Sequence, residues 1–175
     1  MLRGIRVLFF CCRSPPKGPH VRRTRSTDRV NASADVTAHA RPSQRALPET
    51  TWESQAFWTG GANGQLLIFR CNDCSHFFHP PTPACFRCRS MNVAPAPVSG
   101  LATVAAFSIN VHQWLPGFPP PYVVAIVELD DEPDVRLTTN VMDCDVHDVH
   151  IGMRVEVLFE QWEDVWIPVF RPVAR

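Results

Sequence analysis

The chain has 175 residues, of which 45% are hydrophobic and 19% are charged. This length gives room for one domain of ordinary size or two small ones. No stretch approaches the roughly eighteen consecutive apolar residues of a transmembrane helix, so the sequence predicts no membrane span.

Positive and negative charges balance over the whole chain but are separated along it. Residues 1–45 carry ten Lys and Arg against two acids, whereas residues 46–175 carry seven Arg against fifteen acids. The first segment is also rich in Ser, Thr and Pro and lacks a sustained apolar period. We therefore expect residues 1–45 to be a disordered basic tail.

The beginning of this tail is basic and then apolar, which invites comparison with a signal peptide. Its apolar run, residues 7–12, spans only six residues, and no small-x-small cleavage site follows it. A transit peptide fits the Arg-rich, acid-poor stretch better. The simplest interpretation is a dispensable tail or an extension from an upstream start codon.

Residues 46–64 predict a short N-terminal helix. Thr50 or Thr51 can cap its first turn, where Glu53 favours the positive end of the helix dipole. Glycines at positions 60, 61 and 64 end it. The two side chains expected to pack against the next domain, or in the alternative to dock on a partner protein, are Trp52 and Trp58.

Four cysteines in two Cys-x-x-Cys pairs form the strongest motif of the chain. They are separated by ten residues and follow an apolar strand at residues 65–70. Two such turns facing each other complete the tetrahedral four-thiolate site that zinc prefers, with no open position for catalysis. We predict a rubredoxin-like zinc ribbon over residues 65–95, with the structural zinc ligands Cys71, Cys74, Cys85 and Cys88.

The surroundings of these cysteines limit the chemistry of the metal. His76 and His79 are near enough to compete as ligands, but four thiolates leave them outside the metal's own shell. Ser75 and Arg89 stand where such knuckles usually carry glycine, because the turn there needs positive φ. We therefore expect strained turns, and an electron-transferring iron site is the less favoured alternative.

From residue 99 onward the pattern is that of strands. Apolar or alternating segments at residues 100–110, 122–129, 135–139, 153–159 and 166–170 are separated by turn residues. Five short strands predict a small closed barrel, an OB fold, over residues 96–175. The fold class is thus mainly β, with an N-terminal helix, a zinc ribbon and a five-stranded barrel.

Two loops of the predicted barrel carry candidate functional residues. The Pro-rich loop at residues 112–121 contains Trp114 and Phe118, and is either a recognition surface or a cap on the barrel. Cys144 lies in an acidic loop, and its acidic neighbours should raise its thiol pKa and make it unreactive. A second metal site there is conceivable, although a solvated connection is favoured; its ligands would be Asp143, Asp145, His147 and His150.

The sequence shows no catalytic constellation: no Ser/His/Asp set, no Gly-rich phosphate loop and no carboxylate pair stands out. We therefore assign no catalytic residue and expect a protein that is not an enzyme.

The order of these parts resembles a family of acyl-CoA-associated proteins in which a rubredoxin-like zinc ribbon precedes an OB fold, the domain of unknown function thirty-five. The resemblance extends over residues 47–173. Its matching residues are Phe57-Trp58, the ribbon Cys71–Cys88 with Pro80-Pro81 inside it, Ser99-Gly100, and the segments 121–129, 152–157 and 168–172.

The resemblance implies a non-catalytic accessory subunit that binds or scaffolds an acyl-CoA-processing enzyme. The implied partner is a thiolase, a lipid-transfer-type aldolase or a hydratase, whose acyl-CoA site the subunit can complete. Acyl-CoA itself is a candidate ligand of this chain.

Nucleic-acid binding is the alternative function, because zinc ribbons and OB folds both serve it. Residues 99–175 carry twelve acids and four Arg, and an acidic barrel repels phosphate. We therefore expect neither nucleic acid nor membrane as a partner. Reduced cysteines in metal spacing favour a cytoplasmic location.

Overall fold

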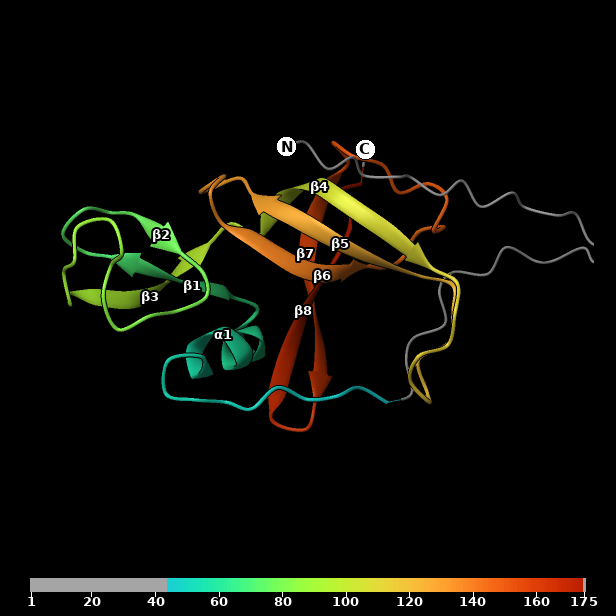
Figure 1. The fold of residues 1–175 in the computed structure, drawn as a ribbon, viewed down its shortest axis with the longest axis horizontal. Helices are drawn as coiled ribbons and strands as arrows, with labels where there is room; N and C mark the ends of the chain where they lie inside the picture. Colours follow the sequence, from blue (N-terminus) through green and yellow to red (C-terminus); the bar gives the residue numbers. More distant parts are fainter. Residues whose placement is uncertain (1–43, 175) are drawn as a thin grey trace, which may run out of the picture. The chain divides into compact units, whose positions relative to one another are not determined.

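The computed structural model describes residues 44–174, so the predicted basic tail lies outside the described residues except for Gln44 and Arg45. The described chain forms two short helices, a three-stranded sheet and a closed five-stranded barrel (Figure 1), which confirms the predicted fold class. In chain order the elements are α1 (Gln55–Thr59), η1 (Gly60–Asn63), β1 (Leu66–Cys71), β2 (Phe77–Phe78), β3 (Val93–Val98), β4 (Leu101–Asn110), β5 (Tyr122–Leu129), β6 (Arg136–Val141), β7 (Arg154–Trp162) and β8 (Val165–Pro172).

The start of the helix differs from the prediction. Thr51 and Ser54 exchange hydrogen bonds, with Thr51 N donating to Ser54 Oγ at 2.9 Å and Ser54 N donating to Thr51 Oγ1 at 3.3 Å. These local bonds hold a turn, so α1 begins only at Gln55 and has no acidic residue in its first turn. Thr51 thus caps the turn that leads into α1, as predicted, because its Oγ1 accepts the N–H of Ser54 and its carbonyl accepts the N–H of Gln55. The predicted helical position of Glu53 was wrong, since Glu53 lies before α1.

The helix nevertheless seats an aromatic residue in the core. Phe57 is buried, and Trp58 packs edge-on against it with ring centroids 4.7 Å apart. Trp52, by contrast, is 70% exposed, so the prediction that it packs against the next domain was wrong. None of the helices in residues 44–174 has the length and hydrophobicity needed to cross a membrane.

The three-stranded sheet has the order β2-β1-β3, with both pairings antiparallel. The strand β3 was not predicted, because Pro95 and Pro97 within it argue against a strand. It pairs along all six residues of β1, from Leu66 opposite Val98 to Cys71 opposite Val93. As an edge strand it tolerates prolines, since its outward backbone groups have no ladder to complete.

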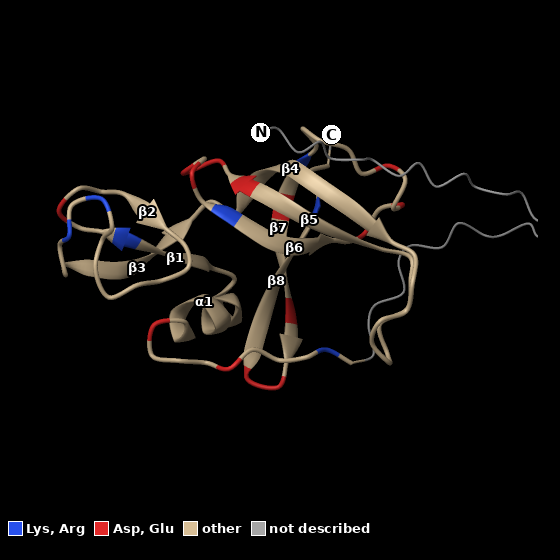
Figure 2. Cartoon of the chain, viewed as in Figure 1, with Lys and Arg blue, Asp and Glu red and all other residues tan. Residues whose placement is uncertain are grey.

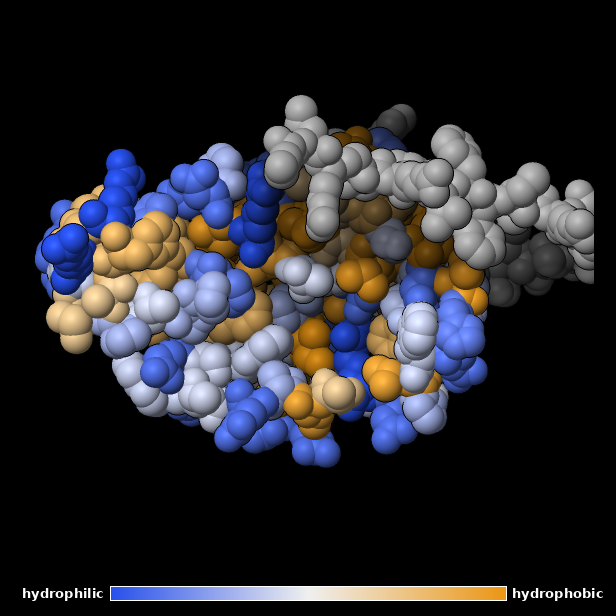
Figure 3. All heavy atoms as spheres, viewed as in Figure 1, coloured by the Kyte–Doolittle hydropathy of each residue, from blue (hydrophilic) through white to orange (hydrophobic). Residues whose placement is uncertain are grey.

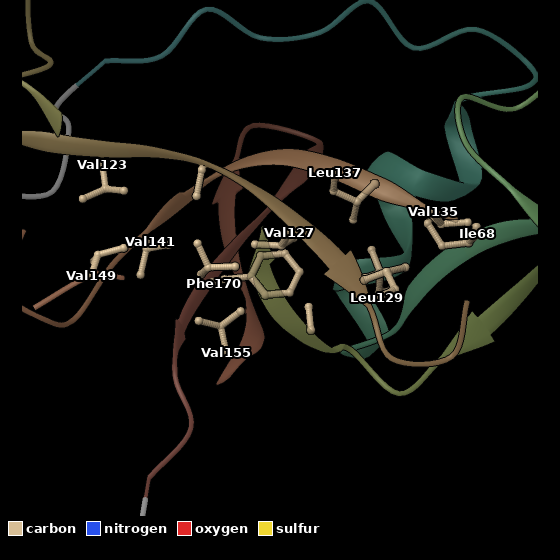
Figure 4. Packing of buried hydrophobic residues seen from close by; sticks show 14 of the residues in the cluster. Ile68, Val123, Val127, Leu129, Val135, Leu137, Val141, Val149, Val155 and Phe170 are labelled. Carbon is tan, nitrogen blue, oxygen red and sulfur yellow. The ribbon is translucent and has the colours of Figure 1, made fainter. Parts of the chain in front are cut away.

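The strand β1 serves two hydrophobic clusters, one on each of its faces. Leu66 and Ile68 belong to the cluster that fills the barrel, whereas Phe69 and Cys71 belong to the cluster around the cysteines. Because successive side chains of a strand point to opposite faces, one short strand connects both cores. Figure 4 shows Ile68 at the end of the barrel core, near Leu129 and Val135.

The barrel closes in the order β4-β5-β6-β8-β7. Alternation along β5 is regular: Val123, Ala125 and Val127 are buried, whereas Val124 and Ile126 are exposed. The predicted strands are all present, with boundaries shifted by a few residues. Closure is weakest between β6 and β8, which pair in parallel at only one position, Val141 opposite Phe170.

Candidate metal centre and ligand groove

The two cysteine knuckles adopt the strained turns that the sequence predicts. Ser75 and Arg89 have φ of 62° and 63°, a region that non-glycine residues rarely occupy. In each knuckle the amide of this residue donates to the carbonyl of the first cysteine: Ser75 to Cys71 at 2.8 Å and Arg89 to Cys85 at 2.7 Å. The same turn is therefore built twice.

Polar side chains connect the two knuckles. Asp73 accepts hydrogen bonds from Ser90 Oγ and from Asn92 Nδ2, and Asn72 Nδ2 donates to Asn92 Oδ1 at 2.9 Å. The bonds from Ser90 and then Asn92 hold the pKa of Asp73 below its ordinary value. This network fixes the distance between the two turns and so presents their sulfurs to one another.

The four sulfur atoms lie within 4.8 Å of one another. Cys71 Sγ is 3.5 Å from Cys88 Sγ, and Cys74 Sγ is 3.6 Å from Cys85 Sγ. A disulfide would need about 2.05 Å. Sulfurs bound to one tetrahedral zinc at about 2.3 Å lie about 3.8 Å apart, so these spacings fit a shared metal ion.

The pKa values of the thiols also reflect how closely the four sulfurs lie together. Burial raises the pKa of Cys71, but the backbone N–H groups of Cys74 and Asp73 and neighbouring thiols outweigh it and lower that pKa to about 7. For Cys88 the N–H of Ser90 lowers the pKa, whereas the sulfurs of Cys74 and Cys71 together raise it to about 12. Crowded thiolates repel one another, and a shared cation removes that repulsion.

The two nearby histidines lie outside the set of sulfur ligands. His76 is buried, with Nδ1 3.9 Å from Glu132 Oε2. The ring of His79 packs against Phe57 with centroids 4.7 Å apart, and burial lowers its pKa. The sequence predicts both histidines outside the metal's own shell, and the group of clustered ligand atoms contains the four cysteines and neither histidine.

The acidic loop after β6 forms no second group of three metal-ligating side chains within the described part of the chain. Asp145 Oδ1 instead accepts the backbone N–H of His147 at 2.8 Å, and His150 Nδ1 lies 2.9 Å from the carbonyl of Asp148. Burial raises the pKa of the Cys144 thiol, and the acids at 148, 145 and 143 raise it further. This confirms the predicted effect of the acidic neighbours.

A groove of about 480 Å³ lies beside the weakly closed side of the barrel. Its volume falls in the range of small-molecule sites. Its lining combines aromatic and aliphatic side chains with neutral hydrogen-bonding groups and the cationic guanidiniums of Arg45 and Arg136, and contains no carboxylate, cysteine or serine. The lining residues are Arg45, Phe57, Trp58, His79, Leu115, Phe118, Tyr122, Val124, Arg136, Leu137, Thr138, Thr139, Asn140, Ile167, Pro168 and Val169.

The Pro-rich loop before β5 contributes to this groove and to the surface. Phe118 packs edge-on against Tyr122, with centroids 4.4 Å apart, and both line the groove. Trp114 is 70% exposed, and its Nε1 donates to Asn110 Oδ1 at 2.7 Å. Phe118 and Tyr122 thus face the groove and Trp114 faces solvent, and the choice between a recognition surface and a cap stays a prediction.

Sequence reasoning missed the polar end of the groove. Arg45 Nε donates to Glu160 Oε2 at 3.1 Å, and Arg45 Nη2 donates to Asn140 Oδ1 at 2.8 Å. These partners are 115 and 95 residues away in the chain, so no local pattern could reveal them. Arg45 had been assigned to the end of the basic tail.

The arginines of the barrel strands are each paired with an acid. Arg136 contacts Glu128, Arg154 contacts Asp130 and Arg171 contacts Glu156. Figure 2 shows the Asp and Glu residues of the barrel beside these few Arg residues. A surface on which cations are neutralised in pairs offers little attraction for nucleic-acid phosphates.

Apolar side chains are exposed near the groove. Val111, Trp114 and Leu115 of the loop and Val124 and Ile126 of β5 are among the exposed large hydrophobic residues. Figure 3 shows apolar residues on the viewed face, between hydrophilic ones. Of these residues, Leu115 and Val124 also line the groove, so exposed apolar surface continues into it.

Comparisons with known proteins match both halves of this arrangement. The family described as "ChsH2, rubredoxin-like zinc ribbon domain" matches residues 58–94, and "ChsH2, C-terminal OB-fold domain" matches residues 96–160. The solved structure "Ltp2-ChsH2(DUF35) aldolase" superimposes with a TM-score of 0.64 at 34% identity, covering 72% of this chain and 98% of that chain.

Two curated relatives extend the match. A "Probable enoyl-CoA hydratase alpha subunit" of Thermomonospora curvata is 36% identical over 121 residues, which cover 68% of this chain and 37% of the relative. A "DUF35 domain-containing scaffold protein" of Methanocaldococcus jannaschii is 34% identical over 99 residues, which cover 55% of this chain and 68% of the relative. The chain thus spans little more than a third of the hydratase subunit and about two thirds of the scaffold protein. It belongs to the DUF35 family, in which a rubredoxin-like zinc ribbon is joined to an OB-fold domain.

Proposed function

We propose that this chain is a non-catalytic accessory subunit that binds or scaffolds an acyl-CoA-processing enzyme. The observation that carries the proposal is the lining of the groove, which offers apolar surface, neutral hydrogen-bonding groups and the guanidiniums of Arg45 and Arg136, but no carboxylate, cysteine or serine. Such a lining can hold a ligand or a partner segment, and its one imidazole, His79, packs against Phe57 and is hydrogen-bonded to none of the hydroxyl groups that line the groove.

The class of partner is inferred from the names of similar proteins. They include a hydratase subunit, a scaffold protein and an aldolase complex. We infer a hydratase or a lipid-transfer-type aldolase as partner, with a thiolase as the third candidate. A groove of small-molecule size beside a partner's active site is suited to complete a site for an acyl-CoA thioester.

The metal has a structural function in this proposal. Cys71, Cys74, Cys85 and Cys88 would hold one zinc ion through four thiolates, which leaves no open coordination position. Zinc binding then supplies folding free energy to a sheet too small to fold alone. Since the ligands must stay reduced, we expect the complex in the cytoplasm.

The docking surface that we propose is the exposed apolar set around the loop before β5. Trp114 is its most suitable anchor, because a large exposed aromatic residue loses much contact with water on association. Trp52 provides a matched comparison: it is also 70% exposed, but it precedes α1 and lies outside this loop. Docking through Trp52, the alternative that the sequence left open, would reverse the effects of the two variants.

Nucleic-acid binding is the competing function, and the charge distribution disfavours it. The barrel arginines Arg136, Arg154 and Arg171 are paired with acids, and residues 99–175 contain three times as many acids as Arg. Salt-sensitive binding of a random oligonucleotide by a chain lacking residues 1–43 would favour that function over ours.

Purification of the tagged full-length chain from its native cells tests the proposal. We expect a stoichiometric acyl-CoA enzyme, identified by mass spectrometry, to co-purify with the wild-type chain and with Trp52→Ala. The Trp114→Ala variant should retain clearly less of it. A monodisperse chain without any acyl-CoA enzyme would contradict the proposal.

A further inference from the structure

The side of the barrel that carries the groove is held together by few direct strand contacts. Beyond the single pair Val141 and Phe170, Met142 N donates to the carbonyl of Phe170 at 2.7 Å, and Thr139 Oγ1 donates to the carbonyl of Pro168 at 2.9 Å. We call this line between β6 and β8 the seam. The groove lies along it, since five consecutive residues of β6 and three of β8 line it.

The guanidinium of Arg45 joins elements on both sides of the seam. It donates to Glu160 of β7, the strand that pairs with β8, and to Asn140 of β6. It also lies over the ring of Phe118, 5.3 Å from the centroid. One side chain thus contacts β6, β7 and the loop that covers the groove.

The contacts of Arg45 are formed away from water. The side chains of Arg45 and Glu160 are only 14% and 6% exposed. Asn140 is buried as well, and its Nδ2 donates to the carbonyl of Val123 at 2.8 Å, which fixes Oδ1 toward the guanidinium. Breaking a buried, charge-assisted bond of this kind is far more consequential than breaking an exposed ion pair.

Arg45 lies outside the matched family domains. Those domains begin at residues 58 and 96, whereas Arg45 belongs to the segment that precedes α1.

We propose that Arg45 is a latch. It holds residues 44–48, which we call the strap, across the seam and keeps the loop of residues 111–121 over the groove. With the latch closed, the groove residues Phe57, Leu137 and Val169 are shielded from water, whereas Leu115 and Val124 are exposed. With the latch open, the loop moves and the buried groove residues become accessible. The strap thereby regulates what enters the groove, whichever partner the protein binds.

The test uses the full-length, metal-loaded chain with two readouts: hydrogen exchange of residues 111–121 and fluorescence of the neutral apolar dye Nile red. We expect Arg45→Ala to speed exchange in this loop about tenfold and to raise dye fluorescence severalfold. Arg45→Lys should be intermediate, because an ammonium keeps the charge but not the two-pronged geometry. Arg171→Ala, which removes an exposed ion pair, should match wild type.

A second variant protects the test against simple unfolding. Phe118→Leu removes the ring under the guanidinium but leaves the bonds to Glu160 and Asn140 in place, so it should loosen the loop while circular dichroism and metal content stay unchanged. The latch is contradicted if Arg45→Ala exchanges and binds dye like Arg171→Ala, whatever Phe118→Leu does. Because neither readout involves an acyl-CoA enzyme, failure here is distinct from failure of the proposed function.

Discussion

Two residues in the metal knuckles hold backbone conformations that their side chains disfavour. Ser75 and Arg89 have positive φ in the position that glycine occupies most easily. The fold tolerates this because each amide completes a hydrogen bond to the first cysteine of its knuckle. The strain is therefore local, and a substitution at either residue can relieve it while all four cysteines stay in place.

Replacing Arg89 by glycine should stabilise the metal-loaded protein. Relief of left-handed strain, of order 1–2 kcal/mol, should exceed the entropic cost of glycine, leaving a gain of about 0.5 kcal/mol in the free energy of unfolding. Urea denaturation measures it. Arg87→Gly is the matched control: Arg87 is exposed, lies two residues earlier and has no positive φ, so glycine there should destabilise. Equal losses in both variants would show that the turn is unstrained.

His79 should make stability depend on pH. Burial lowers its folded pKa below the unfolded value of 6.5, so protonation favours the unfolded chain. Its contribution is fully present above pH 6.5 and is lost as pH falls through the folded pKa.

The variant His79→Phe keeps a ring against Phe57 and should flatten this part of the pH profile. Denaturation between pH 7.5 and about 5 measures the difference in the free energy of unfolding between wild type and variant. Loss of the metal in acid affects both proteins equally and therefore cancels in this difference. His147→Phe, at an exposed histidine, is the control. If the free energy of unfolding of wild type and of His79→Phe depended on pH in the same way, His79 would not be the cause of the pH dependence.

At the scale of elements, η1 depends on a glycine for its contact with the β7–β8 hairpin. A Cβ on Gly61 would lie 2.4 Å from Trp166 Cβ and 2.5 Å from Phe159 Cδ1, both closer than atoms can approach. The sequence marked Gly60 and Gly61 only as the end of a helix. For Gly61 the second function, close packing, depends on residues about a hundred positions later, whereas Gly60 packs against nearby Gln65 and Leu67.

We expect Gly61→Ala to lower the free energy of unfolding by about 1–3 kcal/mol, as overpacking does. The control Gly64→Ala meets no atom within 4 Å but has φ of 68°, so it should lose only about 1 kcal/mol from backbone strain. Thermal and urea unfolding compare the two. A Gly61→Ala variant more stable than Gly64→Ala would mean that η1 does not pack as described.

The elements that could be predicted from sequence are those with a strong local signal. The alternation of β5 and the two Cys-x-x-Cys pairs gave a strand and a ribbon at the right places. Two features were predicted wrongly for local reasons. Thr51 and Ser54 hydrogen-bond to each other, so α1 begins later than predicted. The prolines within β3 are typical of a loop, so this strand was not predicted. The bonds of Arg45 to Glu160 and Asn140 depend on tertiary proximity alone, which no periodicity records.

At the scale of the molecule, β1 makes the ribbon and the barrel interdependent, because its two faces belong to two cores. Removing the metal should therefore destabilise both. Structural zinc contributes about 10–16 kcal/mol of binding free energy in small zinc-dependent folds, so its loss should release residues 66–98 and expose one end of the barrel core.

Chelation of the full-length protein, or Cys85→Ser at a buried ligand, should lower the unfolding temperature and speed hydrogen exchange in β1 and in β5 near Leu129. Cys144→Ser, at a half-buried thiol outside the metal set, should retain metal and stability near wild type. Exchange that rises in the ribbon but not in the barrel would show that the two cores are independent.

The central claim is that this DUF35 chain serves an acyl-CoA enzyme without performing chemistry itself. Its most direct test is a steady-state assay of the co-purified enzyme with its acyl-CoA substrate, with and without the purified, metal-loaded chain. We predict no turnover by the chain alone and a changed kcat/KM for the enzyme on its addition, weakened by Trp114→Ala and not by Trp52→Ala. Turnover by the isolated chain, or an enzyme indifferent to its presence, would contradict the claim.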